Sequence, residues 1–164
     1  MFKFRLATTV LLAAWAVTAF PTPALARGPA ADEVKAEIMA KLHKVEAALA
    51  RGDTAEQVAH SLYADNVLMV GEGEAGSSRG IDVAIKGVQG WMDSLGPNGG
   101  KGCKYSIPDP VVASEKTFTS FVLLVCKANP PVLSEDQQLR MIYSWEKRSD
   151  EWRVVLEMWA LGVM

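Results

Sequence analysis

The sequence has 164 residues, of which 49% are hydrophobic and 22% are charged, and its formal net charge at pH 7 is −2. This length fits one domain, and the apolar content excludes an intrinsically disordered chain. The basic residues are scattered along the chain rather than gathered in one stretch, so we expect no nucleic-acid partner.

The first 26 residues have the order of a secretory signal peptide. Lys3 and Arg5 precede the apolar run Leu6–Phe20, and Ala24 and Ala26 are the small residues expected before a cut after Ala26. An uncleaved anchor is the competing interpretation, but the run is shorter than the about 20 residues of a spanning helix. We therefore expect a mature domain at residues 27–164, periplasmic or secreted, without membrane contact after cleavage.

The mature chain opens with an amphipathic helix. Apolar residues recur every three or four positions over 34–49, which predicts a helix that Asp32 caps and Gly52 ends. His43 falls on this helix and His60 on the next. Their separation does not match zinc-ligand spacing, so we expect no metal site.

Two further helices are predicted before the chain changes to strands. Asp53 and Glu56 resemble a capping box that opens a helix through Leu62. A third apolar stripe covers 81–95 and is weakened by its glycines, such as Gly90.

A short apolar run at 67–70 predicts a strand buried on both faces, and a glycine-rich loop follows at 71–80. The loop has neither a phosphate-binding lysine nor GxGxxG spacing. Period-two patterning then predicts four strands at 103–113, 116–127, 139–147 and 152–161. Pro108 and Pro110 predict a bulge or an edge position in the first of these four strands.

The two cysteines fall on neighbouring predicted strands. A turn at Ser114 and Glu115 would place Cys103 directly opposite Cys126, within reach of a disulfide. A bulge near Pro108 could shift this register by one residue and separate the sulfurs. The alternative is two ordinary buried cysteines, so the pairing is a prediction that depends on export.

The last two predicted strands form a hairpin with two different faces. A turn at residues 149–150 pairs even-numbered apolar residues of the last strand with the apolar residues Tyr143 and Met141. The other face mixes charge with bulk and pairs Glu157 with neighbours such as Arg140 or Arg153. The apolar face is either a packed core or partly the wall of a pocket, and the periodicity does not decide between them.

Four segments in order resemble the NTF2-like superfamily, in particular its SnoaL-like branch. They are Glu46–Asp53, Leu62–Val67, Arg79-Gly80 with Ile85, and Ser144–Val155. The resemblance implies an α+β fold, in which three N-terminal helices pack on a strongly curved mixed or antiparallel sheet and enclose a cone. Proteins of this kind include steroid isomerases, cyclases, dehydratases and non-catalytic binding or dimerising domains.

Positions that are polar in catalytic members of the family are apolar here. Val45 stands where the steroid-isomerase pattern has a tyrosine, and Gly71 where it has a base. Leu156, Met158 and Ala160 stand where many SnoaL-like members have histidine and serine. The resemblance therefore implies a fold without naming a reaction.

Two functional hypotheses follow, and neither requires a cofactor. The first is a homodimeric binding module whose cone holds a small apolar ligand, or which serves mainly in dimerisation; its expected lining is Val45, Tyr63, Met69, Trp91, Met141, Tyr143, Leu156 and Met158. The alternative is a SnoaL-type isomerase, cyclase or dehydratase that uses Glu72 or Asp65 with a tyrosine. A carboxylate inside the cone, within hydrogen-bond reach of a tyrosine, would favour the enzyme.

Overall fold

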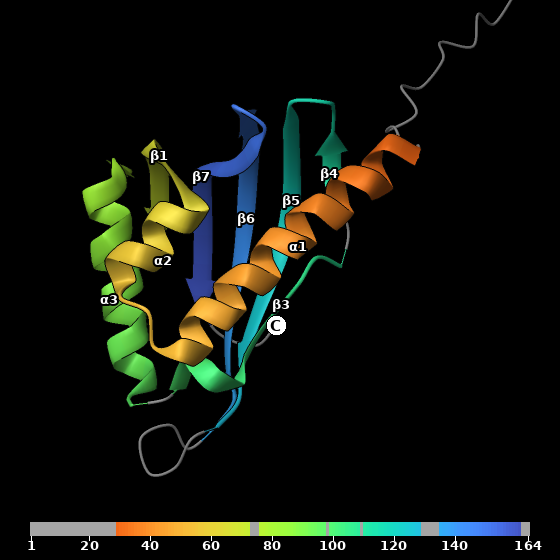
Figure 1. The fold of residues 1–164 in the computed structure, drawn as a ribbon. Helices are drawn as coiled ribbons and strands as arrows, with labels where there is room; N and C mark the ends of the chain where they lie inside the picture. Colours follow the sequence, from red (N-terminus) through yellow and green to blue (C-terminus); the bar gives the residue numbers. More distant parts are fainter. Residues whose placement is uncertain (1–28, 73–75, 98, 109, 129–134, 162–164) are drawn as a thin grey trace, which may run out of the picture.

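The computed structural model describes residues 29–72, 76–97, 99–108, 110–128 and 135–161. Three helices cover one face of a curled seven-stranded sheet (Figure 1), as the sequence predicts for an α+β fold. We call the covered side the inner face and the opposite side the outer face. The predicted signal peptide lies outside the described residues. Among those residues, no helix is long and apolar enough to cross a membrane.

The helices begin slightly differently from the prediction. Helix α1 spans Pro29–Arg51, so Asp32 lies in its first turn and does not cap it. Gly52, at a φ of 84°, ends this helix as predicted. The capping box of α2 (Ala55–Leu62) is formed by Thr54 and Gln57 rather than by the predicted acids, because the chain starts the helix one residue later.

The sheet is mixed, in the order β2-β1-β7-β6-β5-β3, with β4 also paired to β5. Strand β1 runs parallel to β7 and all other pairs are antiparallel. The 71–80 loop holds a strand that the sequence did not predict, the two-residue β2. Helix α3 (Ile81–Leu95) and the 3-10 helix η1 (Gly99–Gly102) follow it. The strands are Tyr63–Gly71 (β1), Ser78–Arg79 (β2), Cys103–Ser106 (β3), Pro110–Ala113 (β4), Thr117–Cys126 (β5), Gln137–Arg148 (β6) and Glu151–Leu161 (β7).

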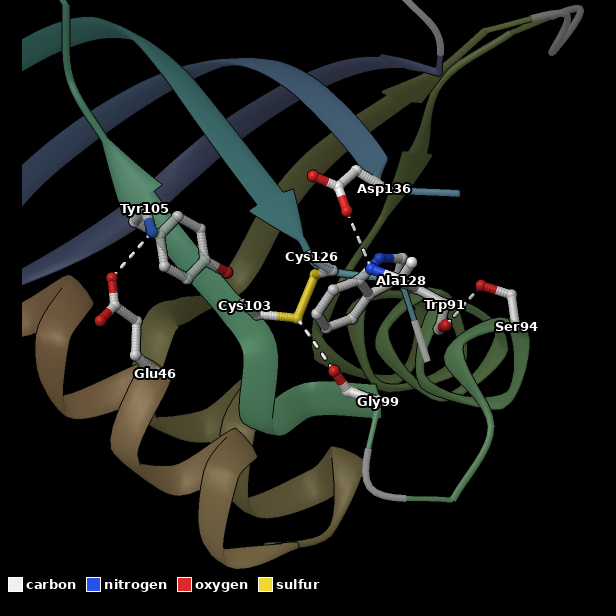
Figure 2. The surroundings of a disulfide bond; sticks show 9 residues. All are labelled: Glu46, Trp91, Ser94, Gly99, Cys103, Tyr105, Cys126, Ala128 and Asp136. Carbon is white, nitrogen blue, oxygen red and sulfur yellow. Dashed lines mark hydrogen bonds between the residues drawn. A yellow bond between two sulfur atoms is a disulfide. The ribbon is translucent and has the colours of Figure 1, made fainter. Parts of the chain in front are cut away.

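The predicted disulfide is present between β3 and β5. Cys103 pairs with Cys126 in the expected register, and their sulfur atoms are bonded (Figure 2). The edge strand is divided into β3 and β4, with Pro108 between them and Pro110 at the start of β4. In β4, Val112 faces Thr119, two residues further along β5 than a turn at Ser114 and Glu115 would place its partner. Strand β4 is therefore offset by two residues from the predicted register, and the irregularity that begins between Pro110 and Val112 restores the predicted register in β3, so the cysteines still face each other.

The hairpin of β6 and β7 contains a bulge that the sequence did not reveal. Trp145 pairs with Val154 as expected, but Ser144 pairs with Leu156, which leaves Val155 as an extra residue. From that point the register moves by one, so Tyr143 faces Glu157 rather than Leu156. The extra residue exchanges the faces of all later side chains of β7 relative to the prediction.

Candidate functional site

A cavity of about 380 Å³ lies between helices α2 and α3 and the inner face of the sheet. Most of its wall is apolar, and side chains from α2, α3, β1, β3, β5, β6 and β7 contribute to it. On α3, Val88 is buried and Trp91 is partly buried, whereas the other lining residues of this helix and the last residue of β7 are exposed. The lining residues of β1 and of the middle of β6 are buried. The cavity therefore has an outer end beside α3 and a deep end within the sheet.

Among the described residues that line the cavity, Glu157 carries the only carboxyl group, and this group lies at the deep end. Its side chain lines the cavity, and the residue is only 4% exposed. Tyr63 donates a hydrogen bond of 2.5 Å from its hydroxyl to Oε2 of Glu157. Burial raises the pKa of Glu157 to about 7, and the hydrogen bond from Tyr63 opposes this change. Near neutral pH both protonation states of Glu157 are therefore populated.

Three tyrosine hydroxyls surround this carboxyl group. Tyr63, Tyr105 and Tyr143 all line the cavity. Burial raises the pKa of each, and the nearby Glu157 charge raises it further. They therefore remain protonated at neutral pH and can donate hydrogen bonds.

The fold holds these hydroxyls in place through contacts with residues of several elements. The ring of Tyr143 packs edge to face against Tyr63, and its hydroxyl donates to the sulfur of Met141 at 3.1 Å. Buried Glu46 on α1 accepts the backbone N–H of Tyr105 at 2.7 Å, which ties α1 to β3 (Figure 2). These contacts fix the tyrosines on different elements around one carboxyl group.

Five of the predicted lining residues do line the cavity, namely Tyr63, Met69, Trp91, Met141 and Tyr143. Val45 lies in the core and borders a separate polar hollow between α1 and the turn joining β6 to β7. Leu156 and Met158 follow the bulge and lie on the outer face, so their predicted place in the cavity is wrong. The same shift corrects the position of Glu157, which the sequence placed on the mixed face.

The two acids proposed from the sequence lie elsewhere. Asp65 is exposed near the start of β1 and does not line the cavity. Glu72 is also exposed, and its Oε2 accepts the backbone N–H of Leu161 at 2.8 Å. The sequence signal for Glu157 was a single acidic residue within an apolar stretch of β7. The side of the sheet that this residue faces depends on the bulge.

The described residues contain no group of three or more histidine, cysteine or acidic side chains placed to hold a metal ion. His43 and His60 are exposed on α1 and α2.

Solved structures with the same architecture share little sequence with this chain. A ketosteroid isomerase-like protein from Erwinia carotovora atroseptica matches with a TM-score of 0.59 and 15% identity, over 81% of this chain and 99% of its own. An NTF2-like protein of unknown function from Pseudomonas putida matches with a TM-score of 0.59 and 16% identity, over 81% and 89%. This chain has the NTF2-like fold. No protein-family model matches the sequence, and no curated protein does.

An NTF2-like protein of unknown function from Shewanella oneidensis gives the same result, with a TM-score of 0.59 and 15% identity over 76% of this chain and 96% of its own. At these identities the likeness establishes the fold alone. The predicted NTF2-like architecture is confirmed, and the function has to be argued from the cavity.

Proposed function

We propose that this NTF2-like chain is a small-molecule acid–base enzyme, in which Glu157 moves a proton on an apolar substrate held in the cavity. The observation that carries the proposal is a carboxyl group buried in an apolar cavity and hydrogen-bonded to a tyrosine. In the described part of the chain, no cation contributes to its pKa. Burying an unpaired carboxyl group costs free energy, which is typical of a site where the group serves a reaction.

The neighbouring hydroxyls suit a substrate that carries a carbonyl group. Glu157 would take a proton from the carbon next to the carbonyl, and the C–H electron pair would form the C=C bond of an enolate. The carbonyl oxygen then becomes an oxyanion, which the hydroxyls of Tyr63, Tyr105 or Tyr143 would stabilise. Glu157 then returns the proton and the ketone is restored. Return to the same carbon gives the starting ketone, whereas return to a conjugated carbon gives its isomer.

The pKa of Glu157 suits this role. A base acts well when its pKa is near the working pH, because it is then ionised often enough and still accepts a proton readily. At a pKa of about 7, the ionised fraction rises through neutral pH. The rate of proton removal should therefore increase with pH and level off above about 8.

The test is hydrogen exchange on a simple ketone. In D₂O, the protein should accelerate replacement of the methyl hydrogens of 4-acetylbiphenyl by deuterium, measured by NMR. Glu157→Gln should lose about 100-fold or more of the acceleration, and Tyr63→Phe at least about tenfold. Glu72→Gln, which changes an exposed carboxylate outside the cavity, is the matched control and should match the wild type.

Two results would contradict the proposal. Exchange that is equally fast with Glu157→Gln would remove this residue from the reaction. If the wild-type protein binds 4-acetylbiphenyl without accelerating exchange, the protein is a binding module, which is the first hypothesis from the sequence, and not an enzyme of this kind. Membership of the SnoaL-like branch stays a prediction in either case.

We further propose that the mature chain is exported and forms a homodimer. Export is supported by the order of charge, apolar run and small residues before position 27, and by a disulfide that an oxidising compartment would preserve. Dimerisation is supported by the exposed apolar side chains of Ile142 and Met158 on the outer face.

A further inference from the structure

Two buried polar atoms in side chains that line the cavity have no hydrogen-bond partner. They are the indole Nε1 of Trp91 and the amide Oε1 of Gln137, and they are the only such side-chain atoms among the residues the structure describes. An atom buried without a partner gives up its hydrogen bond to water, so native proteins contain few of them. Because both atoms belong to residues of one cavity, a molecule bound in that cavity can supply their missing hydrogen bonds.

The two atoms belong to the end of the cavity opposite Glu157. Gln137, Leu139, Met141 and Tyr143 are alternate residues of β6, and all four line the cavity. Tyr143 pairs with Glu157, and Gln137 begins the strand. Six residues of strand separate them, which is about 20 Å at 3.3 Å per residue.

Helix α3 brings Trp91 to the same end as Gln137. The helix starts beside β1, where the N–H of Gly80 bonds to the carbonyl of Val67, and Trp91 lies near its other end. The chain continues through η1 to Cys103, whose bonded partner Cys126 pairs with Gln137. In Figure 2 the Trp91 side chain points toward this disulfide.

The chemistry of the pair defines what it can bind. The indole N–H of Trp91 is a donor only, whereas the amide oxygen of Gln137 is an acceptor. A hydroxyl group accepts from the first and donates to the second, so one hydroxyl can satisfy both. An apolar wall, including Leu139 and Met141, separates this pair from the carboxyl group of Glu157.

We propose that Trp91 and Gln137 form a second polar subsite that binds a hydroxyl group of the substrate. This inference rests on the proposed function. It defines the substrate class as an elongated, mainly apolar molecule with a carbonyl group at one end and a hydroxyl group at the other. The carbonyl end enters the deep part of the cavity, and the hydroxyl end stays near α3. Trp91 and Gln137 orient the substrate and take no part in proton transfer.

Two probes that differ by one hydroxyl group test the subsite. The probes are 4-acetyl-4′-butylbiphenyl and its 4-hydroxybutyl counterpart, whose flexible chain extends the hydroxyl group toward the far end of the cavity. Their dissociation constants are measured by calorimetry for each variant. On the wild type, the hydroxyl group should strengthen binding about tenfold, the effect of one or two neutral hydrogen bonds. Trp91→Phe and Gln137→Leu should each remove most of this gain, which is measured as the ratio of the two dissociation constants on the same variant.

Glu157→Gln separates the subsite from the reaction. This variant should keep the tenfold gain from the hydroxyl group even though it loses hydrogen exchange. If the hydroxyl group gives no gain on the wild type, or if the gain survives in both Trp91→Phe and Gln137→Leu, the subsite is wrong and the proton-transfer proposal stands. If the folded wild type binds neither probe, both proposals fail. If Trp91→Phe does not fold, Gln137→Leu alone tests the subsite, because Gln137 is partly exposed and its substitution perturbs the core less.

Discussion

The burial of Glu157 couples its protonation to the stability of the fold. The pKa of this carboxyl group is about 7 in the folded protein, against an ordinary value of 4.5. The folded state therefore holds the proton more tightly than the unfolded chain does. Stability from this residue is highest below about pH 4.5 and falls as the pH rises to about 7. The whole change corresponds to about 3 kcal/mol.

Substitution by an amide should abolish this pH dependence. The free energy of unfolding is measured with urea for the wild type and for Glu157→Gln between pH 4.5 and pH 8. As the pH rises over this range, the value for the wild type should fall by about 3 kcal/mol relative to the value for Glu157→Gln. The difference between the two proteins isolates Glu157, because every other titrating group is common to both. A difference that stays constant with pH would mean that Glu157 has an ordinary pKa in the folded state.

At the scale of the elements, the outer face of β6 and β7 has no covering layer within the described chain. Ile142 and Met158 are neighbours across the two strands and are 39% and 45% exposed. A second copy of the same surface would cover them through a two-fold axis, the usual symmetry of homodimers. We expect such a pairing to bury this part of the sheet.

A charge placed on this face should separate the subunits. Ile142→Lys should convert the dimer into a monomer in light scattering after size-exclusion chromatography, because a buried lysine without a partner is costly. Ala47→Lys adds the same charge at an exposed position of α1 and should leave the dimer intact. A monomeric wild type at micromolar concentration would overturn the prediction.

At the scale of the whole molecule, the disulfide is tied to the predicted export of the chain. The bridge joins residues separated by 23 positions and links the edge strand β3 to its neighbour β5. Closing a loop of this size restricts the unfolded chain and stabilises the fold by about 3 kcal/mol. An oxidising compartment is needed for the bridge to form and persist.

Protein recovered from a bacterial periplasm should have the mass of residues 27–164 minus two hydrogens. Reduction, or the double substitution Cys103→Ala with Cys126→Ala, should lower the free energy of unfolding by about 3 kcal/mol. A full-length mass would contradict cleavage after Ala26. Two titratable thiols in the folded, non-reduced protein would contradict the bridge.

Local patterns were sufficient for much of the architecture. The apolar stripes placed three helices, and the period-two runs placed the main strands, because these spacings follow directly from helix and strand geometry. Counting from a turn at Ser114 and Glu115 also predicted the pairing of Cys103 with Cys126, and it holds because the offset of β4 along β5 is removed before β3 is reached. Five of the eight expected lining residues lie on the cavity wall, as the helix and strand periods predicted.

The acid of the site could not be placed by counting. Both faces of β7 carry apolar residues, so either register buries a plausible surface, and the sequence favoured the one with Leu156 and Met158 inside. One extra residue, Val155, reverses that choice and turns Glu157 toward the tyrosines.

By itself, the sequence determined the order of the three helices and the main strands and the cysteine pair, because each depends on spacing along the chain. The export segment stays a prediction. Only the tertiary structure decided which side of β7 faces the cavity. A bulge forms where twisted strands pack against helices, and that packing lies beyond any local pattern. The same packing left Trp91 and Gln137 without partners on the cavity wall.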